Sequence, residues 1–223
     1  MKRSEWAVIA AVLGDERPTP EIGRWLRSAV GRREMAAYRR TLGTLQRAYG
    51  QVVAPPAPVY YDSLPAPIGR VLVAATPTGL VRVSFRRSEA AFTAELRDRL
   101  RQPVVKSPAH LRPVADQLEA YFGGGRRAFD VPIDLSRLTT FQRRVLQATR
   151  GVRAGEVVSY ADIARRIGQP RASRAVGQAL GHNPVPIVIP CHRVVASDGS
   201  LGGYTGGLTI KKRLLSIEGA LCA

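Results

Sequence analysis

Apolar residues recur at helical spacing through the first fifty residues of the chain. The spacing predicts a short helix over Glu5–Leu13 and a second helix that opens at Thr19-Pro20, because proline is tolerated at a first helical position. Gly31 interrupts this pattern, which then continues through Met35, Tyr38, Leu42, Leu45 and Tyr49. The last predicted helix carries five arginines, Arg32, Arg33, Arg39, Arg40 and Arg47. The segment is predicted to be either a small helix-turn-helix-like module or a helical cap with a solvated basic face.

The pattern changes at a proline-rich linker, Val53–Val59. Beyond it, short runs rich in valine and tyrosine predict strands, separated by turns that contain proline and glycine. We expect strands over Val59–Leu64, Ile68–Thr76 and Gly79–Arg86, helices over Ser88–Leu100 and Pro113–Phe122, and a returning strand over Ala128–Ile133. This part of the chain is predicted to be a small α/β unit with no chemical motif of its own.

From about residue 138 the pattern is mostly helical. A helix is expected from Thr139 to about Thr149, followed by a short extended piece over Gly155–Tyr160. Two helices, Tyr160–Ile167 and Ala172–Leu180, are then joined by a turn at Gly168-Gln-Pro170. Helix, glycine-containing turn and helix is the pattern of a helix-turn-helix, and a plain αα-hairpin is the alternative.

The run Ile187-Val-Ile-Pro-Cys-His-Arg193 presents a candidate nucleophile. Its β-branched residues predict a buried extended segment, which ends at a proline that cannot donate a backbone hydrogen bond. A thiol attacks as the thiolate, and an adjacent base lowers its pKa. Alternatively, Cys191 packs as a small hydrophobic residue, and His192 points to the opposite face of a strand.

Composition and charge indicate which classes of molecule the protein binds. The 223 residues include 34 basic and 17 acidic side chains, a net charge of +17, and only four of the basic residues are lysines. Arginine suits bidentate phosphate contacts, so nucleic acid is the leading partner, ahead of a membrane surface or a bare compositional bias. The two cysteines, Cys191 and Cys222, argue against a disulfide scaffold or a cysteine-rich zinc site. We expect no secretory signal, no membrane span and a cytoplasmic location.

Five motifs stand in an order that resembles one family. They are Ser159-Tyr-Ala-Asp-Ile-Ala-Arg-Arg-Ile-Gly, Arg174-Ala-Val-Gly, Asn183-Pro-Val-Pro-Ile-Val-Ile-Pro-Cys-His-Arg-Val-Val, Gly203-Tyr-Thr-Gly-Gly-Leu and Leu214-Leu-Ser-Ile-Glu-Gly. This order is similar to that of the O(6)-alkylguanine-DNA alkyltransferases, also called methylated-DNA–protein-cysteine methyltransferases. The resemblance covers residues 59–219 and is densest from about 139 onward.

The resemblance implies a fold and a domain order. An RNase H-like α/β domain over 58–135 would precede a mainly helical catalytic and DNA-binding domain with a helix-turn-helix over 136–223. Residues 1–57 would form a basic helical extension with a proline-rich linker, outside the resemblance. The expected partner is double-stranded DNA that contains alkylated guanine, with no cofactor, no metal, no membrane and a monomeric chain.

The resemblance also implies roles for single residues. Cys191 would accept an alkyl group, once and irreversibly, from the 6-oxygen of guanine or the 4-oxygen of thymine. His192 would deprotonate the thiol through a water, Glu218 would polarise His192, and Asn183 would order the turn. Tyr160 would protonate the leaving base and rotate its phosphate.

Further residues would contact the DNA. Arg174 would fill the gap left by the extruded nucleotide, while the small residues Ala175, Gly177 and Ala179 would permit close approach to the minor groove. The base pocket would be lined by Tyr204, Thr205 and the backbone at Val194. The glycines from Gly199 to Gly207 would let the backbone approach the base, and a phosphate-binding loop is the alternative for them.

Two other classes of function stay open. A sequence-specific regulator would use the basic helices and the helix-turn-helix without alkyl transfer. A thiol hydrolase would use Cys191 and His192 over many turnovers.

Overall fold

The computed structural model describes residues 20–49, 56–85 and 87–220. The chain forms two compact units, residues 1–55 and residues 56–223. The helix predicted over Glu5–Leu13, residues 53–55 of the proline-rich linker and Cys222 lie outside the described residues. The finer division at residues 57/58 and 135/136 stays a prediction.

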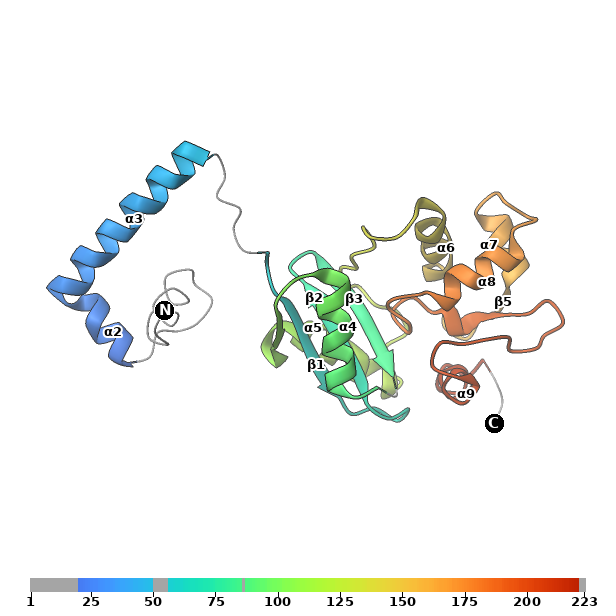
Figure 1. The fold of residues 1–223 in the computed structure, drawn as a ribbon. Coiled ribbons are helices and arrows are strands. Elements are labelled where there is room, and N and C mark those ends of the chain that lie inside the picture. Colours follow the sequence, from blue (N-terminus) through green and yellow to red (C-terminus); the bar gives the residue numbers. More distant parts are fainter. Residues whose placement is uncertain (1–19, 50–55, 86, 221–223) are drawn as a thin grey trace. The chain divides into compact units, whose positions relative to one another are not determined.

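Two helices make up the described part of the first unit (Figure 1). They are α2 (Pro20–Arg27) and α3 (Ala29–Tyr49). The break falls at Ser28, so the interruption predicted at Gly31 is wrong. Ser28 Oγ donates to the carbonyl of Trp25 at 2.7 Å and accepts from the amide of Gly31 at 3.0 Å. Ser28 thus caps the new helix, and Gly31 lies within it.

A four-stranded sheet opens the second unit. Its strands, in the order β3-β2-β1-β4, are β1 (Val59–Leu64), β2 (Val71–Thr76), β3 (Gly79–Phe85) and β4 (Val104–Lys106). The first three strands pair antiparallel, while β4 joins β1 in parallel. The sequence analysis missed β4, because three residues with mostly exposed side chains carry no periodic pattern.

The side chains of β2 alternate between two cores. Leu72 and Ala74 pack in a small cluster with Phe92 and Leu96 of α4 (Glu89–Leu100). Val71 and Val73 join the main core, which includes α5 (Pro108–Phe122) and the helices of the following domain. The predicted start of α5 at Pro113 is wrong, since Pro108 occupies the first helical position and Pro113 lies inside the helix.

The strand predicted over Ala128–Ile133 is also wrong. This stretch forms a single bridge, between Ile133 and Leu80. Pro132 lies within it, and proline cannot donate to a ladder. The carbonyl of Pro132 accepts from Leu80 at 2.8 Å, so the segment attaches to β3 without extending the sheet.

The rest of the second unit is mainly helical. It comprises α6 (Thr140–Arg150), β5 (Val158–Ser159), α7 (Tyr160–Arg166), α8 (Ser173–Gly181), the 3-10 turn Cys191–Arg193, β6 (Val194–Val195) and α9 (Leu208–Ile217). Thr139 with Gln142 and Ser159 with Asp162 form reciprocal capping boxes, which set where α6 and α7 begin. The helices α7 and α8 meet through a short turn, as predicted, and β5 pairs in parallel with β6.

The segment before Cys191 is buried but not extended. Ile187 has a φ of 74°, and Pro186 and Ile189 form an isolated bridge across a turn. The extended segment predicted from the β-branched run is therefore wrong. Two prolines, Pro184 and Pro186, remove the amides that a strand would need, and the side chain of Asn183 bonds the backbone instead. None of the helices in the described ranges is long and apolar enough to cross a bilayer.

Candidate active site

Cys191 lies at the wall of a pocket of about 420 Å³. It is the only cysteine among the described residues, and 5% of its surface is exposed. The pocket brings together the end of α8, the start of α7 and the loop before α9. Its lining residues are Tyr160, Gly177, Leu180, Gly181, Cys191, Gly203, Tyr204 and Thr205.

Asn183 holds the turn that carries Cys191. Its Nδ2 donates to the carbonyl of Ile189 at 2.9 Å and to Sγ of Cys191 at 3.2 Å. Its Oδ1 accepts from the amide of Val185 at 3.1 Å. One buried amide therefore orders both ends of the turn and places a donor against the sulfur.

Glu218, at the end of α9, is the centre of a buried network. Its Oε1 accepts from Nε2 of His192 at 2.9 Å and from the hydroxyl of Tyr121 at 2.6 Å. Arg193 binds both carboxylate oxygens, each at 2.8 Å. The sequence analysis missed Tyr121 and the pairing of Arg193, because no motif links α5 to the 3-10 turn.

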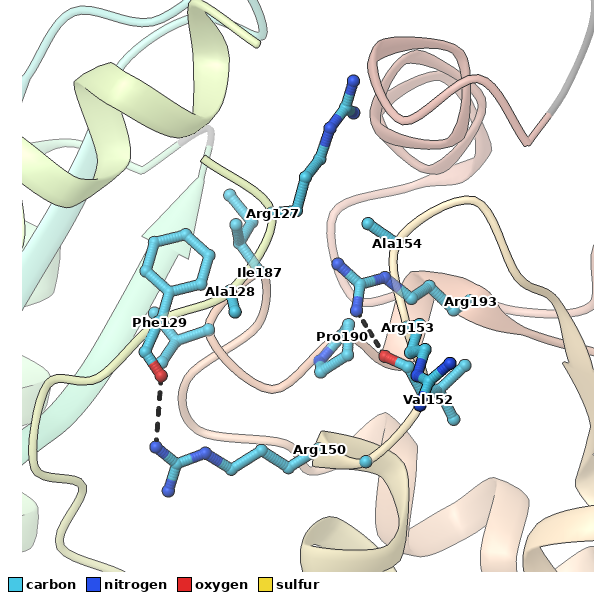
Figure 2. Close-up of a pocket in the computed structure, with 12 residues that line it drawn as sticks. Arg127, Ala128, Phe129, Arg150, Val152, Arg153, Ala154, Ile187, Pro190 and Arg193 are labelled. Carbon is cyan, nitrogen blue, oxygen red and sulfur yellow. Dashed lines mark hydrogen bonds between the residues drawn. The ribbon is translucent and has the colours of Figure 1, made fainter. Parts of the chain in front are cut away.

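Arg193 also ties the network to the chain on its other side. Its Nη1 donates to the carbonyl of Val152, as Figure 2 shows. There Arg193 and Pro190 line a second pocket of about 370 Å³, between residues 127–129 and 150–154. Nearby, Nη2 of Arg150 donates to the carbonyl of Phe129 at 3.3 Å (Figure 2). Arg193 thus ties the turn that carries Cys191 to Val152, and Arg150 ties the end of α6 to Phe129.

The network fixes protonation states. Burial favours the neutral acid of Glu218, but hydrogen bonds from His192 and Arg193 outweigh it and lower its pKa to about 2. The carboxylate can only accept, so Nε2 of His192 carries a hydrogen. Burial, opposed by Glu218, lowers the pKa of His192 below its ordinary value. At neutral pH His192 is therefore a neutral imidazole whose buried Nδ1 has no hydrogen-bond partner among the described residues.

The thiol itself is a weak acid in this setting. Burial raises the pKa of Cys191 to about 11, although the Asn183 donor and the charge of Lys211 act to lower it. Lys211 is fully buried, and its Nζ donates to the carbonyls of Val194 and Leu201. The sequence predicted no role for Lys211 beyond its contribution to the net charge. Lys211 joins β6 to the following loop and brings a positive charge near the sulfur.

Two tyrosines shape the pocket. A side chain at Gly202 would meet the hydroxyl of Tyr160 at 2.9 Å, so this glycine leaves room for the tyrosine, whereas one at Gly177 would make only ordinary contact with the ring, at 3.8 Å. Gly202 also has a φ of 61°, which glycine adopts without strain. Burial and the nearby Cys191 raise the pKa of Tyr160. The hydroxyl of Tyr204 is buried without a hydrogen-bond partner among the described residues.

The remaining predicted residues differ in whether they are exposed, line the pocket or lie in the core. Arg174 is exposed on α8, Ala175 is half-buried, and Gly177 lines the pocket. Ala179 belongs to the hydrophobic core at 5% exposure, so its predicted contact with DNA is not supported. Thr205 lines the pocket and donates to the carbonyl of Gly181 at 3.2 Å. Val194 is buried outside the pocket lining, and its carbonyl accepts from Lys211.

Comparison with known families identifies two matching regions. Residues 59–135 match the model described as "6-O-methylguanine DNA methyltransferase, ribonuclease-like domain". Residues 140–220 match "6-O-methylguanine DNA methyltransferase, DNA binding domain". Residues 1–58 lie outside both matches.

Individual relatives agree. A methylated-DNA–protein-cysteine methyltransferase of Methanosarcina acetivorans is 40% identical over 162 residues, which cover 73% of this chain and 99% of that protein. The constitutive Bacillus subtilis protein of the same name is 36% identical and covers 71% of this chain and 94% of its own. The crystal structure of Mycobacterium tuberculosis OGT in complex with DNA has a TM-score of 0.63 and 39% identity, over 71% of this chain and 92% of that one.

The geometry around Cys191 predicts how its thiol titrates. In a Cys222→Ala background, the rate of alkylation by iodoacetamide should rise with pH toward an inflection near 11. Asn183→Asp replaces the donor by a carboxylate, which disfavours the thiolate, so the inflection should move to higher pH.

The matched control is Gln169→Glu, which makes the same amide-to-carboxylate change in an exposed turn. It should leave the inflection in place, while circular dichroism confirms that each variant stays folded at each pH. An inflection in the folded wild type near the ordinary value for a thiol would contradict the assignment.

Proposed function

Because the chain belongs to the 6-O-methylguanine DNA methyltransferase family, we propose that Cys191 is the residue that accepts the alkyl group. The protein is a methylated-DNA–protein-cysteine methyltransferase, which binds DNA and repairs O6-methylguanine by transfer to a cysteine. One observation carries the assignment. The sulfur of Cys191 lines a pocket, receives a hydrogen bond from Asn183, and adjoins the buried pair of His192 and Glu218.

The proposed step balances without a cofactor. The thiol proton passes through a water to Nδ1 of His192, and the sulfur attacks the saturated carbon of the alkyl group. The new carbon–sulfur bond forms as the bond from carbon to the guanine 6-oxygen breaks. The hydroxyl of Tyr160 donates a proton to the departing guanine. Exchange of protons with solvent restores His192 and Tyr160, so the thiol proton is in effect moved to the guanine.

The buried carboxylate supports this step through His192. When Nδ1 takes the thiol proton, the imidazole becomes a cation that donates to the ionised Glu218. An opposite charge at hydrogen-bond distance favours the charged imidazole. Glu218 is thus a positioning residue, which holds the tautomer and stabilises the charge that forms during the reaction.

We propose that the substrate is double-stranded DNA. The alkylated atom lies inside the base stack, so the nucleotide must be extruded, at a cost of a few kcal/mol. Arg174 on the exposed side of α8 can occupy the vacated space. Ala175 and Gly177 lie one and three residues farther along and permit close approach to the minor groove.

The same proposal covers a second substrate, the location and oligomeric state of the protein, and the number of turnovers. The 4-oxygen of alkylated thymine presents a similar alkyl ether to the pocket. One copy holds every residue of the proposed relay, so the chain is proposed to act as a monomer. The proposed location is the cytoplasm. A thioether is a poor leaving group, so each molecule reacts once.

The proposal predicts a methylated Cys191 as the product. After mixing with duplex DNA that contains O6-methylguanine, the protein should carry one methyl group in place of one hydrogen, as mass spectrometry can show. Peptide mapping should place this methyl group on Cys191. Cys191→Ala should abolish transfer and retain DNA binding. Cys222→Ala, the matched control, should react as the wild type does.

This experiment also separates the alternative classes. A thiol hydrolase would turn over repeatedly and regain its original mass, whereas a regulator would gain none. Methyl transfer by Cys191→Ala, or more than one equivalent of repaired guanine for each protein molecule, would contradict the proposal.

The second prediction concerns extrusion. Arg174→Ala should slow transfer from duplex DNA by about 100-fold, on the order of 2–3 kcal/mol of the flipping cost. Reaction with free O6-benzylguanine needs no extrusion and should change by less than about twofold. Arg171→Ala removes an exposed arginine three residues earlier and serves as the control. Equal losses for Arg174→Ala on both substrates would show that Arg174 does not act in extrusion.

A further inference from the structure

The N-terminal unit carries a one-sided arrangement of charge. At about 100° per residue, the five arginines of α3 fall within an arc of about 120°. These are residues 32, 33, 39, 40 and 47, and the single acidic residue of the helix, Glu34, falls outside that arc. From residue 32 to residue 47 the arc extends about 22 Å along the helix.

The opposite arc of α3 is apolar. Residues 35, 38, 42, 45 and 49 are Met, Tyr, Leu, Leu and Tyr, and by the same register they span about 80°. The helix α2 meets α3 at Ser28, and the side chains of Trp25 and Met35 are partly buried. Arginine and apolar residues thus occupy separate arcs of α3, and the arginine arc is the charged face that can meet another molecule.

The arginine arc faces solvent where its side chains are described. Arg32, Arg33 and Arg40 are all exposed. No ion pair between described residues neutralises any of them, although Arg32 donates to the carbonyl of Arg27. A row of like charges costs stability unless an opposite charge meets it, so the arc is suited to an anionic surface.

We propose that the arginine arc of α3 binds the phosphate backbone of duplex DNA beside the lesion. This inference deepens the proposed function, since it concerns how the same DNA is held, and it does not depend on the acceptor residue. Neither matched domain includes this segment, because the matches begin at residue 59. The contacts would be made to phosphates and would carry no preference for sequence.

The activity of the protein favours DNA over an anionic membrane. The protein already acts on DNA, so the two units meet the same molecule. Every basic residue of α3 is arginine, which forms bidentate bonds with phosphate.

The tether sets the reach of this contact. Residues 50–58 join α3 to β1, and nine residues span at most about 32 Å when fully extended. From Tyr49 back to Arg32 the helix adds about 26 Å, so the farthest contact can lie at most about 58 Å from β1, or roughly 17 base pairs at 3.4 Å each. The second contact should therefore form on any duplex that extends about 20 base pairs beyond the lesion.

The test uses the full chain with Arg32→Gln, Arg33→Gln and Arg40→Gln combined. Glutamine and arginine have similar helix propensities, so the helix should remain, as circular dichroism can verify. On undamaged duplex extended by about 20 base pairs on each side of the central site, affinity at low salt should fall about tenfold. The slope of log affinity against log salt should become shallower by about 0.9 for each phosphate that the variant no longer neutralises. On a short duplex, affinity should change by less than about twofold.

A matched control removes equal charge from the ribonuclease-like domain through Arg97→Gln, Arg99→Gln and Arg112→Gln, all exposed. An equal fall in affinity there on the extended duplex would show a bulk charge effect and overturn the proposal. It would also be overturned by an unchanged slope, or by weakened binding to phosphatidylserine vesicles with DNA binding intact. Reaction with free O6-benzylguanine should be equal in all three proteins, so that a failure of the Cys191 assignment appears separately.

Discussion

The hydrogen bonds to the ionised Glu218 carboxylate are the interactions on which the packing and the site of the second unit depend. The carboxylate accepts from Tyr121 of α5 and from His192 and Arg193 of the 3-10 turn, while Glu218 ends α9. A buried carboxylate is tolerated only when donors surround it, and removing one partner of such a pair costs about 3–5 kcal/mol. Since Tyr121 comes from the ribonuclease-like domain, domain packing and the protonation of His192 rest on the same ion.

That ion also explains how a buried thiol serves in a reaction that occurs once. With a pKa of about 11, Cys191 is thiolate in roughly one molecule in ten thousand at neutral pH. If Cys191 is the acceptor, as proposed, this small thiolate fraction should slow its reaction with small electrophiles in the resting protein. In the proposed step, neutral His192 is the base that takes the thiol proton, because its other nitrogen is bound to Glu218. Burial, which opposes the thiolate, becomes a source of selectivity.

The sequence predicts the fold and the pocket well where motifs or periodicity are strong, and poorly where a tertiary contact decides. Strands β1 to β3, the pair α7 and α8, and a pocket with Cys191, Tyr160 and Tyr204 follow from pattern and resemblance. The turn at Ile187 was hidden by its β-branched residues, because the prolines and the Asn183 amide override propensity. Tyr121, Lys211 and the carboxylate contact of Arg193 were missed, because their partners lie 97, 17 and 25 residues away and no motif in the resemblance links them, as one does for His192 and Glu218. Ala179 shows the converse error, where a small residue suited to groove contact faces the core.

The most direct test of this account is the protonation of His192, read from its ring nitrogen chemical shifts in the intact protein. The account predicts that near neutral pH Nε2 carries the hydrogen and Nδ1 carries none, because Glu218 is ionised and burial lowers the pKa of the imidazole. In Glu218→Gln this tautomeric preference should weaken. Two protonated nitrogens in the resting protein, or a hydrogen on Nδ1 with none on Nε2, would contradict the claim that Glu218 prepares His192 to receive the thiol proton.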